Sequence, residues 1–431
     1  MRRASRSPAR RFAVVSMVLS LCAALVWPDG AVAVDISWTA QFGTRYPDDA
    51  NGLAIDRAGN LYVIGQTSGE LPGQKAVGMI DAFVRRLDPA GHEVWTRQFG
   101  SPERDLPKGV TVDDAGNVYV VGQTFGSLPG QTSHGGWDAF IRKYSPSGDE
   151  VWTRQFGGGG AESAAAVRVD HAGNVYVVGG TRASLPGQTN IGDWDGFLVK
   201  FDPAGNTVWA RQFGTEGEDY AMAVALDANG APVVAGETAG RLAGAASAGG
   251  LDGFVRQYDA AGNAVWTRQF GSPADDYAVG VAVAPSGDVL AVGTTMGALP
   301  GHTSHGGDTD AYIVAFGPKG GDQWSSQFGT TGGDDAEAIA FDAAGHAFVA
   351  GRVGAALPGA TSSGGSDAFL AAVGPAGDIL WARQFGGQAD DYALGLALAP
   401  GGLFYLAGGT TGALPGQTNL GQRDAFVVSL S

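Results

Sequence analysis

The chain has 431 residues, and its 43 acidic residues against 27 basic ones give a net charge of −16 at pH 7. A surface this acidic repels nucleic acid and anionic membranes, which excludes both as expected partners. The single cysteine, Cys22, lies in an N-terminal segment that we expect to be removed, so no disulfide is expected to stabilise the mature chain.

Residues 1–33 have the features of a secretory signal peptide. An arginine-rich start precedes the apolar run 12–27, and Ala31-Val32-Ala33 supplies the small residues of a cleavage site. The apolar run is too short for a membrane anchor, so we expect no insertion into a membrane. We therefore predict a secreted protein, extracellular or at the cell surface with the periplasm as the alternative, whose folded part is residues 34–431.

The folded part repeats the phrase W-x-x-Q-F-G seven times. Successive Trp residues are 57 residues apart and, in one interval, 58 residues apart: Trp38, Trp95, Trp152, Trp209, Trp266, Trp324 and Trp381. A repeat of this length indicates a solenoid, a propeller or an array.

Residues 109–157 show what one repeat contains. Two apolar, β-branched runs flank a turn at 114–117, a loop rich in Gly and Pro follows, a third run begins at Ala139, and a fourth spans 150–156. Four short strands joined by turns, without a helical period, predict a four-stranded antiparallel sheet, which is the unit of a propeller blade.

The two ends of the folded part complement each other. The seventh repeat stops after its third strand, at 424–428, and the missing fourth strand is found at 36–43. An N-terminal strand that completes the last blade would leave no open sheet edge. We therefore predict an all-β fold, a single seven-bladed β-propeller of four-stranded antiparallel blades closed by its N-terminal strand.

The segments GVTVDDAGNVYVVGQT (109–124) and AVRVDHAGNVYVVGGT (166–181), each followed by a D-A-F or D-G-F strand, resemble the bacterial seven-bladed β-propeller repeats known as SBBP repeats. The resemblance covers the whole mature chain because it recurs in every period. It implies a propeller of the kind found in secreted or cell-surface bacterial proteins. It implies no reaction, since the family is defined by its repeat and has no common set of catalytic residues.

Two acids recur on the face of the predicted disc that carries the long loops, where function on a rigid scaffold usually lies. The first comes six residues after each Q-F-G phenylalanine, beside the innermost strand: Asp48, Asp105, Glu162, Asp219, Asp276, Asp334 and Asp391. The second opens the third strand: Asp81, Asp138, Asp195, Asp252, Asp310, Asp367 and Asp424.

Seven inner carboxylates near one axis could bind a cation, and calcium is the cation most available outside a cell. The alternative is that each acid caps a turn or pairs with an arginine of a W-x-R-Q-F strand, namely Arg97, Arg154, Arg211, Arg268 or Arg383. A ligand-selective residue need appear only once, so repetition in every blade favours the structural role. No cofactor other than calcium is expected.

Departures from the repeat mark candidate ligand-binding residues. Trp137 and Trp194 precede the third-strand Asp in blades two and three only, where exposed rings could stack on sugars. The alternative is that each ring folds back on its own loop.

Histidines form the second group of candidates. His134 lies in the loop of blade two, and His302-x-x-His305-x-x-Asp308 in blade five has a spacing that a metal could use. A loop offers no fixed face for these side chains, which weakens the metal hypothesis.

From these patterns we predict a monomeric binding scaffold without catalysis, whose ligand is an extracellular protein or a glycan. The sequence contains no nucleophile elbow, phosphate loop, zinc helix or dinucleotide fingerprint. The alternative is an extracellular hydrolase or lyase that acts on a polysaccharide and uses two loop-face carboxylates as acid and base.

Overall fold

The structure is a computed structural model that describes residues 35–431 except 243 and 400. The predicted signal peptide, residues 1–33, lies outside the described residues. All regular structure in the described part of the chain is β-strand, and no helix in that part is long and apolar enough to cross a membrane.

The strands alternate with turns and loops along the whole described chain. In chain order they are β1 (Ile36–Phe42), β2 (Asp48–Ile55), β3 (Leu61–Thr67), β4 (Asp81–Leu87), β5 (Glu93–Phe99), β6 (Asp105–Val112), β7 (Val118–Thr124), β8 (Asp138–Tyr144), β9 (Glu150–Phe156), β10 (Glu162–Val169), β11 (Val175–Thr181), β12 (Asp195–Phe201), β13 (Thr207–Phe213), β14 (Asp219–Leu226), β15 (Pro232–Thr238), β16 (Asp252–Tyr258), β17 (Ala264–Phe270), β18 (Asp276–Val283), β19 (Val289–Thr295), β20 (Asp310–Phe316), β21 (Asp322–Phe328), β22 (Asp335–Phe341), β23 (Ala347–Val353), β24 (Asp367–Val373), β25 (Ile379–Phe385), β26 (Asp391–Leu398), β27 (Phe404–Thr410) and β28 (Asp424–Leu430).

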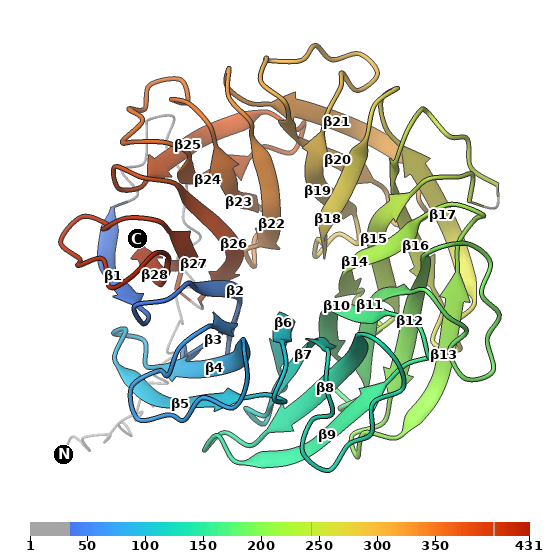
Figure 1. Ribbon diagram of the computed structural model, residues 1–431. Helices are drawn as coiled ribbons and strands as arrows, with labels where there is room; N and C mark the ends of the chain where they lie inside the picture. Colours follow the sequence, from blue (N-terminus) through green and yellow to red (C-terminus); the bar gives the residue numbers. More distant parts are fainter. Residues whose placement is uncertain (1–34, 243, 400) are drawn as a thin grey trace, which may run out of the picture. The chain divides into compact units, whose positions relative to one another are not determined.

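These strands form seven antiparallel sheets of four strands each, arranged as the blades of a propeller (Figure 1). Blades 1 to 6 each take four consecutive strands, from β2–β5 to β22–β25. Blade 7 has the order β1-β28-β27-β26, with Thr39 opposite Val428 and Phe42 opposite Ala425. The predicted closure of the ring by the N-terminal strand is therefore confirmed.

The first strand of every blade contains a β-bulge. In β2 the register shifts between Ala50 and Gly52, and the equivalent shift occurs in β6, β10, β14, β18, β22 and β26. A bulge leaves one residue without a partner across the ladder and increases the local twist. Because these strands are the innermost ones in Figure 1, each blade presents its bulge residue to the centre of the ring.

The core lies between the blades. Second strands such as β3 and β7 are buried on both faces, as their continuous apolar runs predict. At the periphery, Trp95 and Phe99 of blade 1 both lie against Tyr144 of blade 2, with ring centroids 6.5 and 6.0 Å apart. The Trp and Phe of the outer strand of blade 1 therefore pack against the neighbouring blade at this junction.

Candidate functional site

The seven acids that lie six residues after the Q-F-G phenylalanines, called here the first-strand acids, are fully buried. They hold the loops that connect the blades. Asp276 shows the arrangement: its Oδ2 accepts hydrogen bonds from the Ser272 backbone N–H at 2.6 Å and from Ser272 Oγ at 3.1 Å. Burial raises the pKa of all seven acids, and raises that of Asp105 to about 6. Their primary role is therefore to cap turns.

The seven third-strand acids are also buried, and each accepts a hydrogen bond from the glutamine of its blade's Q-F-G phrase. In blade 1, Gln98 Nε2 lies 2.7 Å from Asp81 Oδ2 and 2.8 Å from the Gly69 carbonyl oxygen, while Gln98 Oε1 accepts from the Leu71 N–H at 3.0 Å. The fourth strand thereby fixes the long loop between the second and third strands. The same Gln–Asp contact occurs in every blade, at 2.7 or 2.8 Å.

The two sets of acids meet at the blade junctions. Asp276 of blade 5 faces Asp252 of blade 4, and the nearby charge of Asp252 adds to the burial that raises the pKa of Asp276. At the seam, Asp48 Oδ1 and Asp424 Oδ1 are both buried without a hydrogen-bond partner. The first-strand acids are thus distributed over seven separate junctions. No three His, Cys, Asp or Glu side chains in the described residues gather as a metal would require, and calcium binding stays a prediction.

The arginines of the outer strands have other partners. Arg97 Nε donates to the Gly148 carbonyl oxygen at 2.8 Å, Arg154 Nε to that of Gly205 at 2.9 Å, and Arg211 Nε to that of Gly262 at 2.8 Å. Each acceptor lies in the tight turn between the third and fourth strands of the next blade. For these three arginines the predicted pairing with the acids is wrong, because their guanidinium groups connect neighbouring blades at the opposite face.

The two tryptophans singled out in the sequence are half-buried, and each packs on its own surroundings. Trp137 lies 5.4 Å from the ring of Phe125, whereas Trp194 lies 5.6 Å from the ring of Tyr220 and beneath the guanidinium of Arg182 at 5.0 Å. Trp137 thus folds back on its own loop, whereas Trp194 packs between Arg182 of its own loop and Tyr220 of blade 4.

The three histidines are held by different neighbours. The backbone N–H groups of His134 and His305 donate to the third-strand acids Asp138 and Asp310, both at 2.9 Å. His302 Nε2 instead lies 2.9 Å from Ser325 Oγ on the outer strand β21. The sequence spacing of His302 and His305 therefore brings them to different partners.

A ring of seven bulge residues lines the axial channel, which has a volume of about 170 Å³. These residues differ from blade to blade: Asn51, Lys108, Ala165, Met222, Val279, Glu337 and Leu394. Arg168 adds a second cation to the lining. Polar side chains on blades 1, 2, 3 and 6 thus meet apolar ones in a single cavity.

The charged groups of the channel are electrostatically perturbed. Burial lowers the pKa of Lys108 and of Arg168, and it raises the pKa of Glu337 to about 7, with Asp335 adding to the rise. Lys108 Nζ lies 5.8 Å from the ring centroid of Tyr220. Lys108 and Arg168 are exposed in the channel and Glu337 is half-buried there, so a ligand of opposite charge can reach these groups.

A second acidic group lies at the loop-side ends of blades 4 and 5. Burial raises the pKa of Glu237 to about 7, and the negative charges of Glu218 and Asp275 raise it further. Glu237 Oε2 is buried without a hydrogen-bond partner, and burial together with the nearby acids raises the pKa of Tyr277.

Comparison with known proteins identifies the repeat. A family described as "Beta-propeller repeat" (SBBP) matches residues 37–72 and 94–129, which contain the first two Q-F-G phrases. Residues 37–72 and 94–129 therefore carry SBBP repeats.

Two curated relatives match parts of this chain. The regulatory protein FlaEY of Caulobacter vibrioides is 27% identical over 41% of this chain and 21% of its own length. An uncharacterized WD repeat-containing protein of Acanthamoeba polyphaga mimivirus is 30% identical over 22% of this chain and 8% of its own length. The chain therefore spans about a fifth or less of the relatives that it matches.

Two solved structures share the fold of this chain at low sequence identity. The WD40 domain of Neurospora crassa Pan2 has a TM-score of 0.51 at 11% identity and covers 89% of both chains. The polysaccharide lyase Uly1 has a TM-score of 0.50 at 9% identity and covers 88% of this chain and 89% of its own.

The channel ring and Glu237 were not predicted from the sequence. The sequence does contain a signal for the channel ring. The third residue after each first-strand acid differs in chemistry from one repeat to the next. Glu237 gave a similar signal, since its equivalents Gln66 and Gln123 are uncharged. The bulge that turns the varied residue toward the channel could not be read from the pattern.

Proposed function

We propose that this protein is a secreted or cell-surface scaffold that binds an extracellular protein or a glycan without transforming it. The observation that carries the proposal is that the side chains repeated in every blade and the side chains that vary have different roles. The repeated acids and glutamines are engaged in holding turns and loops, whereas the bulge ring of the channel varies in every blade. A scaffold that is the same in each blade and differs at one shared cavity is suited to recognising one ligand.

The chemistry of the channel sets what the ligand must offer. Lys108 and Arg168 can bind an anionic group or a strong hydrogen-bond acceptor of the ligand. Glu337 can bind a hydrogen-bond donor. Met222, Val279 and Leu394 provide apolar contact in the same cavity. With a volume of about 170 Å³, the channel admits only a small group of the ligand, such as a carboxylate-bearing side chain or a sugar substituent.

The experiment is a binding screen that also records the fate of the ligand. The full chain, produced through export, is applied to an array of neutral and acidic glycans, and a photo-cross-linking residue in place of Met222 captures protein ligands. We expect a retained ligand that is recovered at its original size. A polysaccharide that is shortened during incubation would contradict the proposal.

Glu237 favours the enzymatic alternative as a second candidate. A carboxyl group with a pKa of about 7 beside Tyr277 could exchange protons near neutral pH, as an acid or base acting on a polysaccharide must. The polysaccharide lyase with the same fold is consistent with this possibility. Shortening of a polysaccharide by the parent chain, abolished by Glu237→Gln, would support the enzyme.

A further inference from the structure

Three blade junctions contain a buried arginine that reaches from a third strand to the preceding blade. Its guanidinium stacks on the phenylalanine of that blade's Q-F-G phrase. The distance from Cζ to the ring centroid is 4.1 Å for Arg85 on Phe42, 4.3 Å for Arg142 on Phe99 and 4.7 Å for Arg256 on Phe213. The junction between blades therefore includes a place shaped for a guanidinium group.

The fourth strand supplies this guanidinium with polar partners. In blade 1, Arg85 Nε donates to Thr96 Oγ1 at 2.9 Å, and Arg85 Nη2 lies 3.5 Å from Glu93 Oε2. The same set, Arg142 with Thr153 and Glu150, recurs in blade 2. An aromatic face, a hydroxyl and a carboxylate together satisfy a planar cation with several donors.

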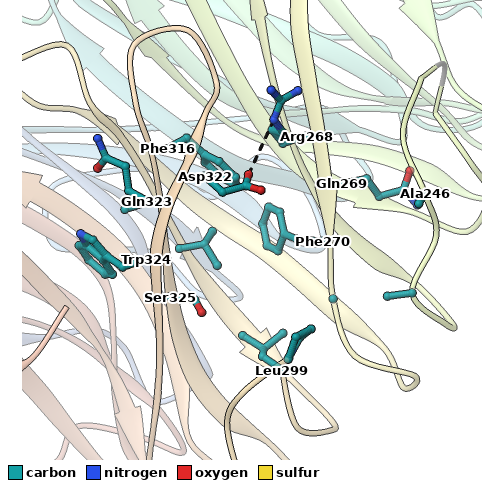
Figure 2. Close-up of a pocket in the computed structure, with 15 residues that line it drawn as sticks. Ala246, Arg268, Gln269, Phe270, Leu299, Phe316, Asp322, Gln323, Trp324 and Ser325 are labelled. Carbon is teal, nitrogen blue, oxygen red and sulfur yellow. Dashed lines mark ion pairs between the residues drawn. The ribbon is translucent and has the colours of Figure 1, made fainter. Parts of the chain in front are cut away.

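Blade 5 keeps these partners and lacks the arginine. Val314 takes the place of Arg85 opposite Ser325, Asp322 takes the place of Glu93, and Phe270 of blade 4 takes the place of Phe42. A pocket of about 440 Å³ lies there, and Val314, Phe270, Ser325 and Asp322 all line it (Figure 2). The pocket lies among outer strands and is separate from the axial channel.

The other three junctions without the arginine do not retain both polar partners. Blades 3 and 6 have alanine at the hydroxyl position, and blades 3, 6 and 7 have no acid at the carboxylate position, where the residues are Thr207, Ile379 and Ile36. Four described junctions thus lack the arginine. Of these, only the junction between blades 4 and 5 keeps both the hydroxyl and the carboxylate.

We propose that this pocket binds a guanidinium group supplied from outside the chain, as in an arginine side chain. The cation would stack on Phe270, donate to Ser325 Oγ and pair with Asp322. Ser325 Oγ can at the same time donate to His302 Nε2, 2.9 Å away. Leu299 and Phe316 give the apolar wall along which the methylene groups of an arginine stem would lie.

Arg268 is the cation nearest to this carboxylate. Its Nε lies 3.8 Å from Asp322 Oδ1 at the rim of the pocket, and the two side chains are 39% and 85% exposed (Figure 2). An exposed pair at this distance is weak. The carboxylate of Asp322 therefore stays available to a second donor, and the chain's net charge of −16 favours a cationic ligand.

The test titrates the full chain with agmatine, with a short arginyl peptide and with the same peptide carrying lysine, measured by calorimetry. We expect binding of the guanidinium compounds and at least about fivefold weaker binding of the lysyl peptide, because an ammonium group lacks the planar fork and stacking face. If agmatine also binds, the site accepts a free guanidinium compound. If only the arginyl peptide binds, the site is specific for an arginine within a polypeptide.

Two variants and a control make the test specific. Asp322→Asn should weaken binding at least about fivefold, and Val314→Arg should abolish it by placing an internal guanidinium on Phe270. Asp149→Asn, at the exposed turn of blade 2, is the control and should bind like the parent. Thermal melts of all variants report folding. The proposal is overturned if neither guanidinium compound binds at millimolar concentration, or if well-folded Val314→Arg binds them as the parent does.

Discussion

Asp276 and Asp252 face each other across Gly271 at the junction of blades 4 and 5. A Cβ built on Gly271 would lie 2.6 Å from Asp276 Oδ2 and 2.7 Å from Asp252 Oδ1. The φ angle of Gly271 is not positive, so steric exclusion, and not backbone conformation, requires glycine here. In every blade the glycine of the Q-F-G phrase lies between the two equivalent acids, so the same steric exclusion requires glycine there.

Replacing this glycine should therefore destabilise the fold. Gly271→Ala is expected to lower the free energy of unfolding by about 2–3 kcal/mol, because the new methyl group must displace two buried carboxyl groups. Gly321→Ala is the matched control, since its Cβ would meet nothing within 4 Å. Denaturant unfolding measures both, and equal stabilities for the two variants would contradict the steric explanation.

The seam of the ring should be far more sensitive than a loop. Gln41 of β1 donates to Asp424 at 2.7 Å and accepts from the Leu414 N–H at 3.0 Å, so β1 fixes both β28 and a loop of blade 7. Deleting residues 35–43 is expected to cost more than about 5 kcal/mol or to prevent folding. Deleting Asp308, the extra residue in the loop of blade 5, should cost little. Similar melting temperatures for the two deletions would refute the role of the seam.

Stability should fall as the pH rises from about 4.5 to about 7. Glu237 has a pKa of about 7 in the folded state against 4.5 for an unperturbed glutamate, so within this window the folded state holds a proton that the unfolded state has lost. Glu237→Gln should weaken this dependence, with Glu337 and Asp105 carrying the rest, and should stabilise the protein at pH 8 by about 1–2 kcal/mol, after allowance for screening by solvent. Glu103→Gln, at an exposed position, is the control. An unchanged pH profile for Glu237→Gln would show that another group carries it.

Asp276→Asn should raise the melting temperature at pH 8. Its side-chain oxygen can still accept from the Ser272 N–H, and its amide can donate to Asp252, which removes a repulsion between buried charges. The melts should be run with calcium, with magnesium and with a chelator. A calcium-specific rise for the parent that Asp276→Asn loses would instead identify the paired acids as a cation site.

The period of the sequence was sufficient to predict the blades, because seven equal spacings and one displaced strand allow a single way of closing the ring. Leu71 and its equivalents, which open the turns of the long loops, are buried in their blades. These features depend on contacts within one repeat or on contacts repeated in all of them.

The candidate sites could not be predicted in the same way, because they depend on contacts between repeats. Arg97 bonds to the next blade, although an acid of its own blade is nearer in sequence. Lys108 faces the channel only because a bulge interrupts the alternation of β6. The pocket beside Phe270 exists because Val314 replaces an arginine whose partners are on two different blades.

The central claim is that the repeated acids are scaffold and that the varied channel side chains bind the ligand. The decisive measurement compares ligand affinity and melting temperature for Lys108→Ala, Glu337→Ala and Asp276→Asn, using the ligand found by the array or by cross-linking at Met222. We expect the two channel variants to lose at least about fivefold in affinity while they remain folded, whereas Asp276→Asn shifts the melting temperature and keeps the affinity. Unchanged affinity in both channel variants, together with lost affinity in a folded Asp276→Asn, would contradict it.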